Sequence, residues 1–364
     1  MIPLQALKRS ARYELIRAGL ECTALLGLAG IGRGSGGRGA IFTLHHVDPA
    51  PVARGAPNGW LTVTPHFLDQ AIRAAIDCGL TPVALDDLPA RLADPQDKAR
   101  YVSFTLDDGY RDNAVHAAPV FRRHGVPYTI FVTAGFVERS RSIWWKTVEE
   151  IVATAEEIDF AFADGQRRIE TKTQLQKIAA FDRLSAFVLD AEDEDAAIAA
   201  VDALAMRHGI DPLGITERET MGIEDLRTLA RDPLARFGAH TLTHANLRRL
   251  DAARLERELS GSADAVERYT GRRPTSFAYP YGHRAAVGGR EIAAARDAGF
   301  AAAVTTMPSL IGSTAPEHPT ALGRVSLNGL YQRRRYVRAL LSGLPFELRR
   351  LARGGPSRDG MDCQ

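Results

Sequence analysis

Two adjacent aspartates, Asp107 and Asp108, offer the clearest catalytic chemistry in this chain. They follow residues 101–106, whose apolar character predicts a buried strand, and Gly109 comes directly after them. Two carboxylates this close repel each other unless a cation or solvent compensates for their charge. One interpretation is therefore a metal ligand beside a general base. The other is an ordinary Asp-Asp-Gly turn at the end of a strand, because glycine tolerates a positive φ.

Two histidines, His240 and His244, follow another short predicted strand and are separated by three residues. Neutral imidazole is a preferred zinc ligand, and two histidines at this spacing can reach one cation. With Asp108 as a carboxylate ligand, one position would stay open for water, as in catalytic zinc sites. Asp107 would then be left to accept the proton of that water.

Polar residues also end two further predicted strands. His45 and His46 follow residues 40–44, and Tyr279-Pro280-Tyr281-Gly282 ends the strand at 275–279. Chemistry in α/β proteins gathers at the carboxyl ends of parallel strands. Because several polar strand ends occur together, the catalytic interpretation of the two aspartates is favoured over the simple turn.

The elements that must position these residues alternate between strand and helix. Apolar stretches predict strands at 40–44, 81–85, 101–106, 128–133, 236–239, 275–279, 301–305 and 321–325. Helical spacing of apolar residues occurs at 67–79, 87–92, 113–124, 252–269 and 290–298. This alternation predicts a parallel sheet covered by helices, either open or closed into a barrel.

A different region, about residues 138–232, interrupts the alternation with helical segments and an acidic run at 190–195. We interpret it as a helical insertion that serves as a lid or partner surface. We expect that the adjacent Trp144 and Trp145 do not both face one core. Trp145 would then lie on the substrate side, where a flat ring stacks on sugars, with ordinary packing under the insertion as the alternative.

Composition indicates an ordinary globular chain. It has 364 residues, 25% of them charged and 45% apolar, with a net charge of +2, and this balance suggests no nucleic-acid partner. The three cysteines show no CxxC spacing, so neither a disulfide framework nor a cysteine zinc site is indicated. A reducing compartment fits this usage.

The two ends of the chain differ from its centre. Residues 2–17 are amphipathic and basic, residues 20–31 are apolar, and residues 30–39 form a glycine-rich joint. This pattern over residues 1–39 predicts either an uncleaved helix on a membrane surface or a secretory signal. The tail at 331–364 is basic, which fits a solvated helix or attraction to an anionic membrane or polymer. We expect a cytoplasmic or peripheral inner-membrane location, with secretion to the periplasm or beyond as the alternative.

Three motifs occur in a recognisable order: FTLDDGY at 104–110, HTLTH at 240–244 and FAYPYG at 277–282. Together they resemble the polysaccharide deacetylases with a NodB-like domain, carbohydrate esterase family 4, over about residues 40–330 apart from the insertion. The resemblance implies a distorted (β/α)7 barrel that holds one divalent metal, most often Zn²⁺. It also implies that the catalytic base is Asp107 and that the metal ligands are Asp108, His240 and His244. The groove would be lined by Tyr279, Pro280, Tyr281 and Gly282, with a backbone N–H near Tyr281 as an oxyanion donor.

Two family features are absent from their usual places. The third motif often carries an arginine that pairs with the catalytic aspartate, but residues 276–278 contain none, so we expect Arg324 to serve instead. The general acid often comes from a late Leu-x-His segment, which this chain also lacks. We therefore assign that role to His46, with His45 as its neighbour or substitute, in contact with the substrate.

The predicted function is a metal-dependent hydrolase that removes N-acetyl groups from amino sugars of a polysaccharide, oligosaccharide or lipid-linked glycan. One alternative is a catalytically inactive, glycan-binding barrel. Another is a deacylase of a different N-acyl or O-acyl sugar. A phosphate-acting metal hydrolase fits less well, because such enzymes generally present more carboxylate ligands.

Overall fold

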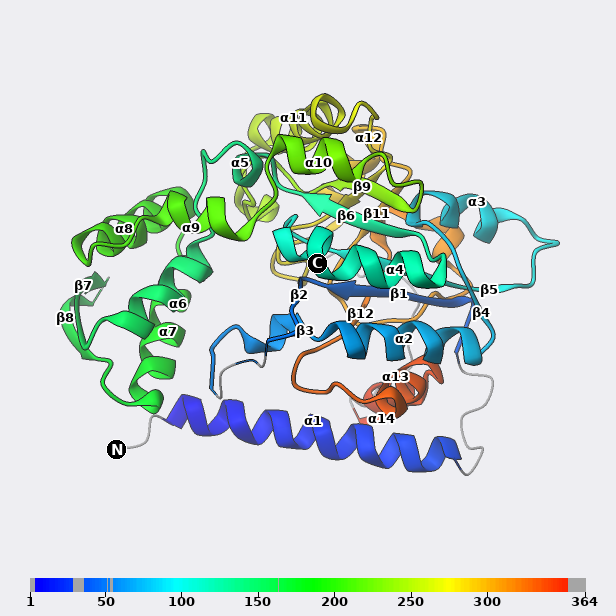
Figure 1. Cartoon of the computed structure of the whole chain (residues 1–364), viewed down its shortest axis with the longest axis horizontal. Helices are drawn as coiled ribbons and strands as arrows, with labels where there is room; N and C mark the ends of the chain where they lie inside the picture. The colour runs from blue at the N-terminus through cyan, green and yellow to red at the C-terminus, as the bar shows by residue number, and fades with distance from the viewer. Residues whose placement is uncertain (1–3, 29–35, 51, 53–54, 163, 353–364) are drawn as a thin grey trace.

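A twisted parallel sheet surrounded by helices forms the main body of the chain (Figure 1). The computed structural model describes residues 4–28, 36–50, 52, 55–162 and 164–352. Within them the main sheet has eight strands, and seven follow the order β11-β10-β9-β6-β5-β1-β12, while β4 pairs with the start of β5. The strands are β1 (Gly39–Leu44), β4 (Leu80–Pro82), β5 (Arg100–Leu106), β6 (Tyr128–Val132), β9 (Ala235–Ala239), β10 (Ser276–Ala278), β11 (Ala302–Val304) and β12 (Val325–Ser326).

All pairings in this sheet are parallel, so the strands' carboxyl ends lie at one rim. The central strands β1 and β6 are buried along their full length, as expected when helices cover a parallel sheet. The covering helices are α2 (Pro65–Asp77), α3 (Leu88–Ala93), α4 (Ala118–His124), α10 (Ile223–Leu229), α11 (Ala252–Thr270) and α12 (Gly289–Asp297).

The segment 322–326 connects the two edges of the sheet. Val325 and Ser326 pair with Phe42 and Thr43 of β1, while Leu322 forms a parallel bridge with Val304 of β11. Backbone pairing therefore passes from β11 through this segment to β1. The arrangement is the predicted distorted (β/α) barrel, and it places Arg324 between the two edges.

Local sequence explains where the helices begin and end. The Oγ1 atom of Thr64 accepts a hydrogen bond from the Phe67 N–H and caps α2, which begins at Pro65, a favoured first helical residue. Asp251 caps α11 in the same way, and Gly271 ends that helix in the left-handed conformation. These signals agree with the helices predicted at 67–79 and 252–269.

The insertion leaves the barrel after β6 and α5 (Ala134–Val137) and has its own hydrophobic core. It lies on the left in Figure 1. Its elements are α6 (Trp144–Thr154), β7 (Glu157–Phe162), β8 (Gly165–Glu170), α7 (Gln174–Leu189), α8 (Glu194–Arg207) and α9 (Pro212–Glu219). The chain rejoins the barrel where Thr220 bridges to Tyr110 and the Met221 N–H donates to the Gly109 carbonyl.

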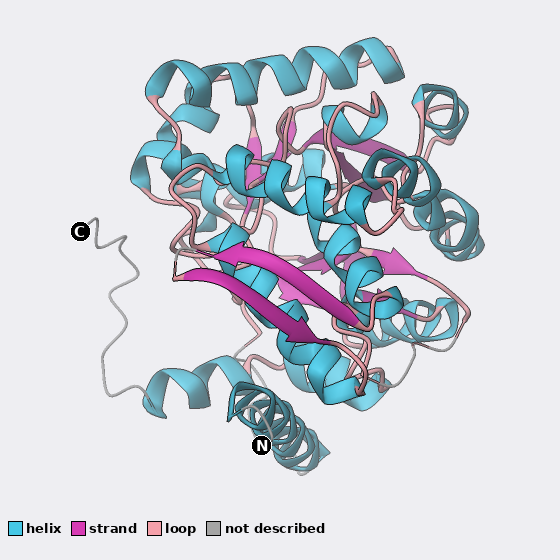
Figure 2. Cartoon of the chain, turned by 90° about the vertical axis from the view of Figure 1, so that its left-hand side faces the viewer, coloured by secondary structure: helices cyan, strands magenta, loops and turns pink. Residues whose placement is uncertain are grey.

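The region predicted as a helical insertion is mostly helical, but it also contains two strands. β7 and β8 form an antiparallel hairpin, which faces the viewer in Figure 2. In β7 the side chains alternate, so that Ile158 and Phe160 pack inward. β8 is almost entirely exposed and polar, so its sequence shows no apolar alternation that would predict a strand. α10, also inside the predicted range, packs on the barrel helix α11, and its buried Leu226 and Leu229 belong to the barrel core.

Three helices from the ends of the chain lie along one side of the barrel. They are α1 (Leu4–Leu28), α13 (Arg334–Leu341) and α14 (Leu344–Ala352), and α1 contacts both of the others (Figure 1). Most of the predicted glycine-rich joint at 30–39 lies outside the described residues. Among the described helices, none combines the length and apolar character needed to span a bilayer.

Candidate metal centre and catalytic site

Asp107 and Asp108 end β5 in a turn that sends their side chains to different partners. Asp108 has a φ of 70° and Gly109 a φ of 68°, so two consecutive residues occupy the left-handed region. This conformation is uncommon for residues other than glycine, although aspartate tolerates it better than most. The turn directs Asp107 toward Arg324 and Asp108 toward two histidines.

His240 and His244 come from the end of β9 and the loop after it. The ring of His240 is fixed because its Nδ1 lies 2.6 Å from the Ala278 carbonyl, to which it donates. That hydrogen bond leaves Nε2 as the free ligand atom, a common arrangement for metal-binding histidines. The loop has two further residues with positive φ, Thr241 at 65° and His244 at 58°.

Glu258 of α11 holds this loop in place, and sequence reasoning missed it. Its carboxylate accepts hydrogen bonds from the Leu242 N–H at 2.7 Å, the Thr243 N–H at 3.0 Å and the Thr243 hydroxyl at 2.6 Å. Glu258 is only 3% exposed. The signal for it was a charged residue on the otherwise apolar inner face of the predicted helix, beside Leu259.

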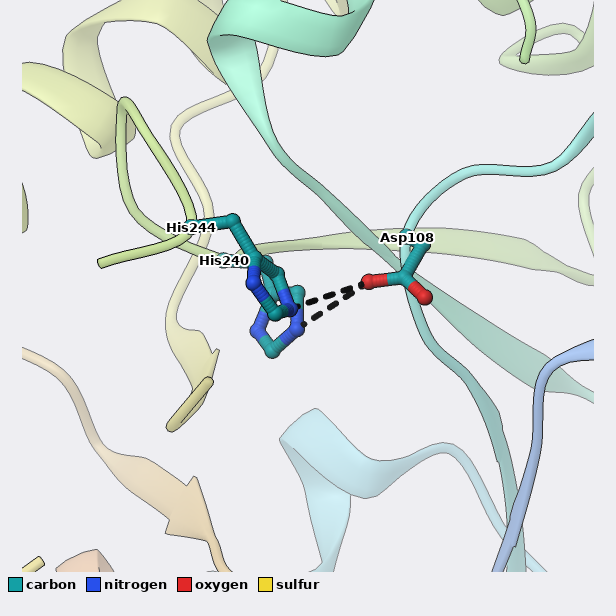
Figure 3. Close-up of side chains that lie close together, drawn as sticks. All are labelled: Asp108, His240 and His244. Atoms are coloured by element: carbon teal, nitrogen blue, oxygen red, sulfur yellow. Dashed lines mark ion pairs between the residues drawn. The ribbon is translucent and has the colours of Figure 1, made fainter. Parts of the chain in front are cut away.

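Asp108, His240 and His244 form a buried cluster in which one ligand atom from each residue lies within 4.8 Å of the others (Figure 3). Both histidine Nε2 atoms are 3.4 Å from the same carboxylate oxygen, Asp108 Oδ1. Burial opposes ionisation of Asp108, but the two imidazoles lower the pKa of this carboxyl well below its usual value. The cluster therefore keeps a carboxylate ready to bind a cation.

The donor set of this cluster fits a divalent cation. Asp108 Oδ1 is buried and has no hydrogen-bond partner in the described part of the chain, which is costly unless another group compensates for it. The 3.4 Å separations exceed ordinary hydrogen bonds. Two ligands bonded tetrahedrally to one zinc at about 2 Å would lie about 3.3 Å apart. Three ligands also leave a position for water or substrate.

Asp107 is bound by Arg324 through two hydrogen bonds. Nη1 donates to Oδ1 and Nη2 to Oδ2, each at 2.7 Å, and the guanidinium also donates to the Thr305 carbonyl and the Thr105 hydroxyl. Burial alone would favour the neutral acid, yet the Arg324 guanidinium keeps the pKa of Asp107 below its ordinary value. The residue that we expected to replace the missing arginine thus contacts Asp107 directly.

The two histidines after β1 take different positions. His45 points toward the site, with Nε2 3.8 Å from Asp107 Oδ2. His46 is held elsewhere, because its Nδ1 lies 2.6 Å from an Asp112 carboxylate oxygen and its ring centroid is 3.6 Å from that of Tyr110. Burial is the main cause that lowers the pKa of His45, and Asp107 partly offsets it.

The segment 279–282 divides into core and site residues. Tyr279 is buried, and its hydroxyl donates to the Thr320 carbonyl, so its side chain belongs to the core. Tyr281 has a φ of 61°, and its ring centroid is 5.1 Å from that of the ligand His244. The Gly282 N–H donates to the Pro280 carbonyl. Gly282 has a φ of 64°, and a Cβ there would lie 2.5 Å from the Thr306 nitrogen.

The insertion contributes directly to the wall of the cluster. Trp144 Nε1 donates to the Tyr281 hydroxyl at 3.1 Å, and Trp145 Nε1 donates to the Tyr110 hydroxyl at 3.0 Å. The Tyr281 hydroxyl in turn donates to Glu194, the first residue of α8. These contacts fix the aromatic residues around His244.

The expectation that the two tryptophans face different surroundings was wrong. Trp144 and Trp145 are only 5% and 8% exposed, and both belong to the hydrophobic core of the insertion. Their rings pack perpendicular to each other with centroids 5.6 Å apart. Trp145 also lies 4.8 Å from the His244 ring. It therefore packs behind a metal-ligand candidate and does not present an open face for a sugar.

Trp60 is an exposed aromatic residue close to the site. It is 37% exposed, and its ring meets that of His45 edge-on with centroids 6.3 Å apart. Its short 3-10 helix (Gly59–Leu61) follows Asn58, whose Nδ2 donates to the Trp145 carbonyl and to Glu149 of α6. The insertion thus anchors the segment that carries Trp60. No motif marked this residue in the sequence.

The fold and the cluster define a parallel (β/α) barrel with a carboxylate-histidine centre at the carboxyl rim of its strands. The sequence model of the polysaccharide deacetylase domain matches residues 94–160 and 188–303, about half of the chain. The chain belongs to the polysaccharide deacetylase family, and it is a hydrolase.

Solved structures are similar to this chain at low sequence identity. The deacetylase PplD of Streptococcus pyogenes, in complex with acetate, has 15% identity and a TM-score of 0.52, over 80% of this chain and 92% of that one. IcaB of Ammonifex degensii has 16% identity and a TM-score of 0.51, over 83% and 97%. A polysaccharide deacetylase of Bacillus cereus has 15% identity and a TM-score of 0.52, over 83% and 68%. These likenesses show the NodB-like fold. A comparison with curated proteins found no match.

Proposed function

We propose that this protein removes N-acetyl groups from the amino sugars of a glycan and that it uses one divalent cation, Zn²⁺ being the best fit. The observation that carries the proposal is the unpartnered, buried Asp108 Oδ1 facing the Nε2 atoms of His240 and His244, with the paired Asp107 in the preceding position. Two imidazoles and one carboxylate are ligands that suit zinc in a catalytic site.

Asp108, His240 and His244 would hold the cation. When bound, a divalent cation at this position would polarise the acyl carbonyl and make a coordinated water more acidic. The residues of the chain supply the rest of the chemistry. Ala278 keeps the His240 Nε2 directed inward, and Glu258 keeps the loop of His244 in place.

Asp107 would act as the general base. It is buried and ionised, and the Arg324 guanidinium holds both of its oxygens by hydrogen bonds of 2.7 Å. A fixed carboxylate beside the cation ligands can accept a proton from the attacking water as the water's oxygen bonds to the acyl carbon. Arg324 would keep the carboxylate in that position during the reaction.

A histidine after β1 would protonate the departing amine. Our sequence-based assignment was His46, and it stays a prediction, but the structure favours His45 for this role. His45 Nε2 is 3.8 Å from Asp107 Oδ2, whereas the His46 Nδ1 is engaged with Asp112. His46 would then stiffen the backbone that carries His45.

The proposed reaction balances with these groups. The water oxygen adds to the acyl carbon while Asp107 takes one proton of the water. The carbon–nitrogen bond breaks, and the amine nitrogen gains one proton from the histidine. Asp107 then releases its proton and the histidine regains one from solvent, which restores both groups. Acetate and a free amino sugar are the products. The Tyr281 backbone N–H is our proposed donor to the oxyanion, which matches its position in the third motif.

Trp60 would contact the glycan beside the reacting sugar. Its exposed ring lies next to His45, and an aromatic face stacks well on the apolar face of a pyranose. With Trp145 buried, Trp60 takes over the sugar-stacking role that we had expected of the insertion.

The alternative of an inactive, glycan-binding barrel rested on the missing arginine. Arg324 now occupies that place on Asp107, so the reason for this alternative is removed. A different N-acyl or O-acyl group remains the closest variant of the proposal, because nothing in the site selects acetyl over another small acyl group.

Release of acetate and of free amine from a panel of acetylated sugars, with and without chelator, tests the proposal. N-acetylglucosamine oligomers should be deacetylated, activity should fall to background after chelation, and Zn²⁺ should restore it. Chelator-resistant activity would reject the metal, and release from O-acetylated sugars alone would reject the amide substrate.

A further inference from the structure

Helix α1 presents two different faces. Its inner face packs on the end of the chain: Leu20, Thr23 and Ala24 are buried, and Glu21 accepts hydrogen bonds from Arg335 and Tyr336 of α13. The helix therefore lies against the body of the protein and is not a detached arm. In Figures 1 and 2 it runs along the periphery, with no described element beyond it.

The outer face of α1 carries a row of apolar residues. Ala11, Leu15, Ala18, Cys22 and Leu25 follow one another at spacings of four and three, which places them on one side of the helix, and all are exposed. Leu15 is 74% exposed and Leu25 is 66% exposed. Single exposed leucines are ordinary, but a row about 20 Å long is a surface that calls for a partner.

α14 contacts α1 and also carries exposed apolar residues. Leu348 and Leu351 are 41% and 69% exposed. We call the exposed apolar residues of α1 and α14 the apolar strip. Basic side chains accompany it on both helices, with Arg12 and Arg17 exposed on α1 and Arg350 exposed on α14. Two acidic residues of α1 are paired with arginines: Glu21 with Arg335 of α13, and the exposed Glu14 with Arg17.

We propose that the apolar strip lies flat on an anionic lipid bilayer. An apolar row flanked by arginines is the pattern of helices that lie in a membrane interface, and anionic lipid attracts nearby basic side chains. A bilayer provides both the apolar phase and the negative charge. A second copy of this chain would bring arginines against arginines, which disfavours a dimer through the same surface. This inference is independent of the deacetylase proposal.

Sedimentation with vesicles tests the inference on the full chain. The protein should bind vesicles of mixed phosphatidylcholine and phosphatidylglycerol, bind pure phosphatidylcholine more weakly, and lose part of its binding in high salt. The double variant Leu15→Glu/Leu25→Glu should bind the mixed vesicles at least about tenfold more weakly, because two leucines no longer enter the apolar phase. Both positions are exposed, so folding and activity on a soluble sugar should be unchanged.

Met206→Glu provides the matched control, since Met206 is 62% exposed but lies on α8. It should bind vesicles like the unsubstituted chain. Absence of binding to the mixed vesicles, or equal binding by the double variant, would overturn the inference. Light scattering gives the remaining outcome: a dimer that the double variant converts to monomer would assign the apolar strip to a second copy and reject the membrane.

Discussion

Arg324 binds both carboxylate oxygens of Asp107, and the two residues are 217 positions apart in sequence. The barrel brings them together because the segment before β12 passes between β11 and β1. From there the Arg324 side chain reaches Thr105 and Asp107 at the end of β5, on the other side of β1. Arg324 is only 1% exposed, so this pair is shielded from water. A charge-assisted, two-point contact of this kind fixes orientation as well as charge.

Replacing Arg324 by lysine should lower turnover about 10- to 100-fold, because lysine keeps the charge but cannot hold both oxygens. Replacing it by methionine should in addition cost about 3–5 kcal/mol of unfolding free energy, since a buried carboxylate loses its partner. Steady-state kinetics and urea unfolding measure the two effects. Near-native turnover of Arg324→Lys would show that Asp107 needs no such support.

His45 and His46 should respond differently to substitution by alanine. Loss of the proton donor should reduce kcat by about 10²- to 10⁴-fold, and we expect this effect for His45→Ala. His46→Ala should have a smaller effect, because that ring contacts Asp112 and Tyr110 and acts through its backbone neighbour. The reverse order of the two kcat values would return the role to His46, our original assignment.

Trp60→Ala should affect long substrates more than short ones. If the ring stacks on a sugar beside the reacting residue, KM should rise about 5- to 100-fold for N-acetylglucosamine oligomers, corresponding to about 1–3 kcal/mol of lost contact. The monomer should be hardly affected, and Trp60→Phe should recover part of the loss. An equal change for monomer and oligomers would place Trp60 outside any neighbouring sugar site.

Stability in the insertion should depend on the ionisation of Asp202. Burial raises the pKa of this carboxyl, although the Ser142 hydroxyl and Arg141 partly offset the effect, and its Oδ1 has no hydrogen-bond partner in the described chain. The folded state therefore prefers the protonated acid. Protonation of Asp202 contributes its full stabilisation below the pKa of the carboxyl in the unfolded chain, about 3.9. This contribution is lost as the pH rises through the higher pKa of Asp202 in the folded protein.

Asp202→Asn should consequently raise the unfolding free energy at neutral pH, by about 0.5–1 kcal/mol, and the advantage should shrink as the pH falls. Thermal unfolding followed across the pH range provides the measurement. The exposed Asp297→Asn serves as the control and should show no such trend. A destabilised Asp202→Asn at neutral pH would mean that the ionised carboxylate is the favoured form.

Much of the fold could be predicted because its elements carry local signals. Residues 101–106 are mostly apolar because β5 is buried on both faces. Gly271 ends α11 because glycine tolerates the left-handed backbone there. The segment 322–326, which closes the barrel, was harder to predict. β12 has only two residues, so its pairing depends on the neighbouring strands more than on its own sequence.

The cluster of Asp108, His240 and His244 could be predicted because each residue sits in a motif at a strand end. Residues that support the cluster from other elements could not. Glutamate is a common residue in helices, so nothing in the sequence marks Glu258 or Glu194. The packing of α11 brings Glu258 to the loop of His244, and the packing of α8 brings Glu194 to Tyr281. Trp145 shows the opposite error, since its residue type suggested sugar binding but its burial places it in the core.

The central claim divides two adjacent carboxylates into two roles, and metal analysis combined with turnover of two variants tests it most directly. Asp107→Asn should retain about one equivalent of Zn²⁺ while losing about 10²- to 10⁴-fold in acetate release, because it removes only the base. His240→Ala should lose the metal and the activity together. An Asp107→Asn protein with near-native acetate release, or a His240→Ala protein that still holds its metal, would contradict the account.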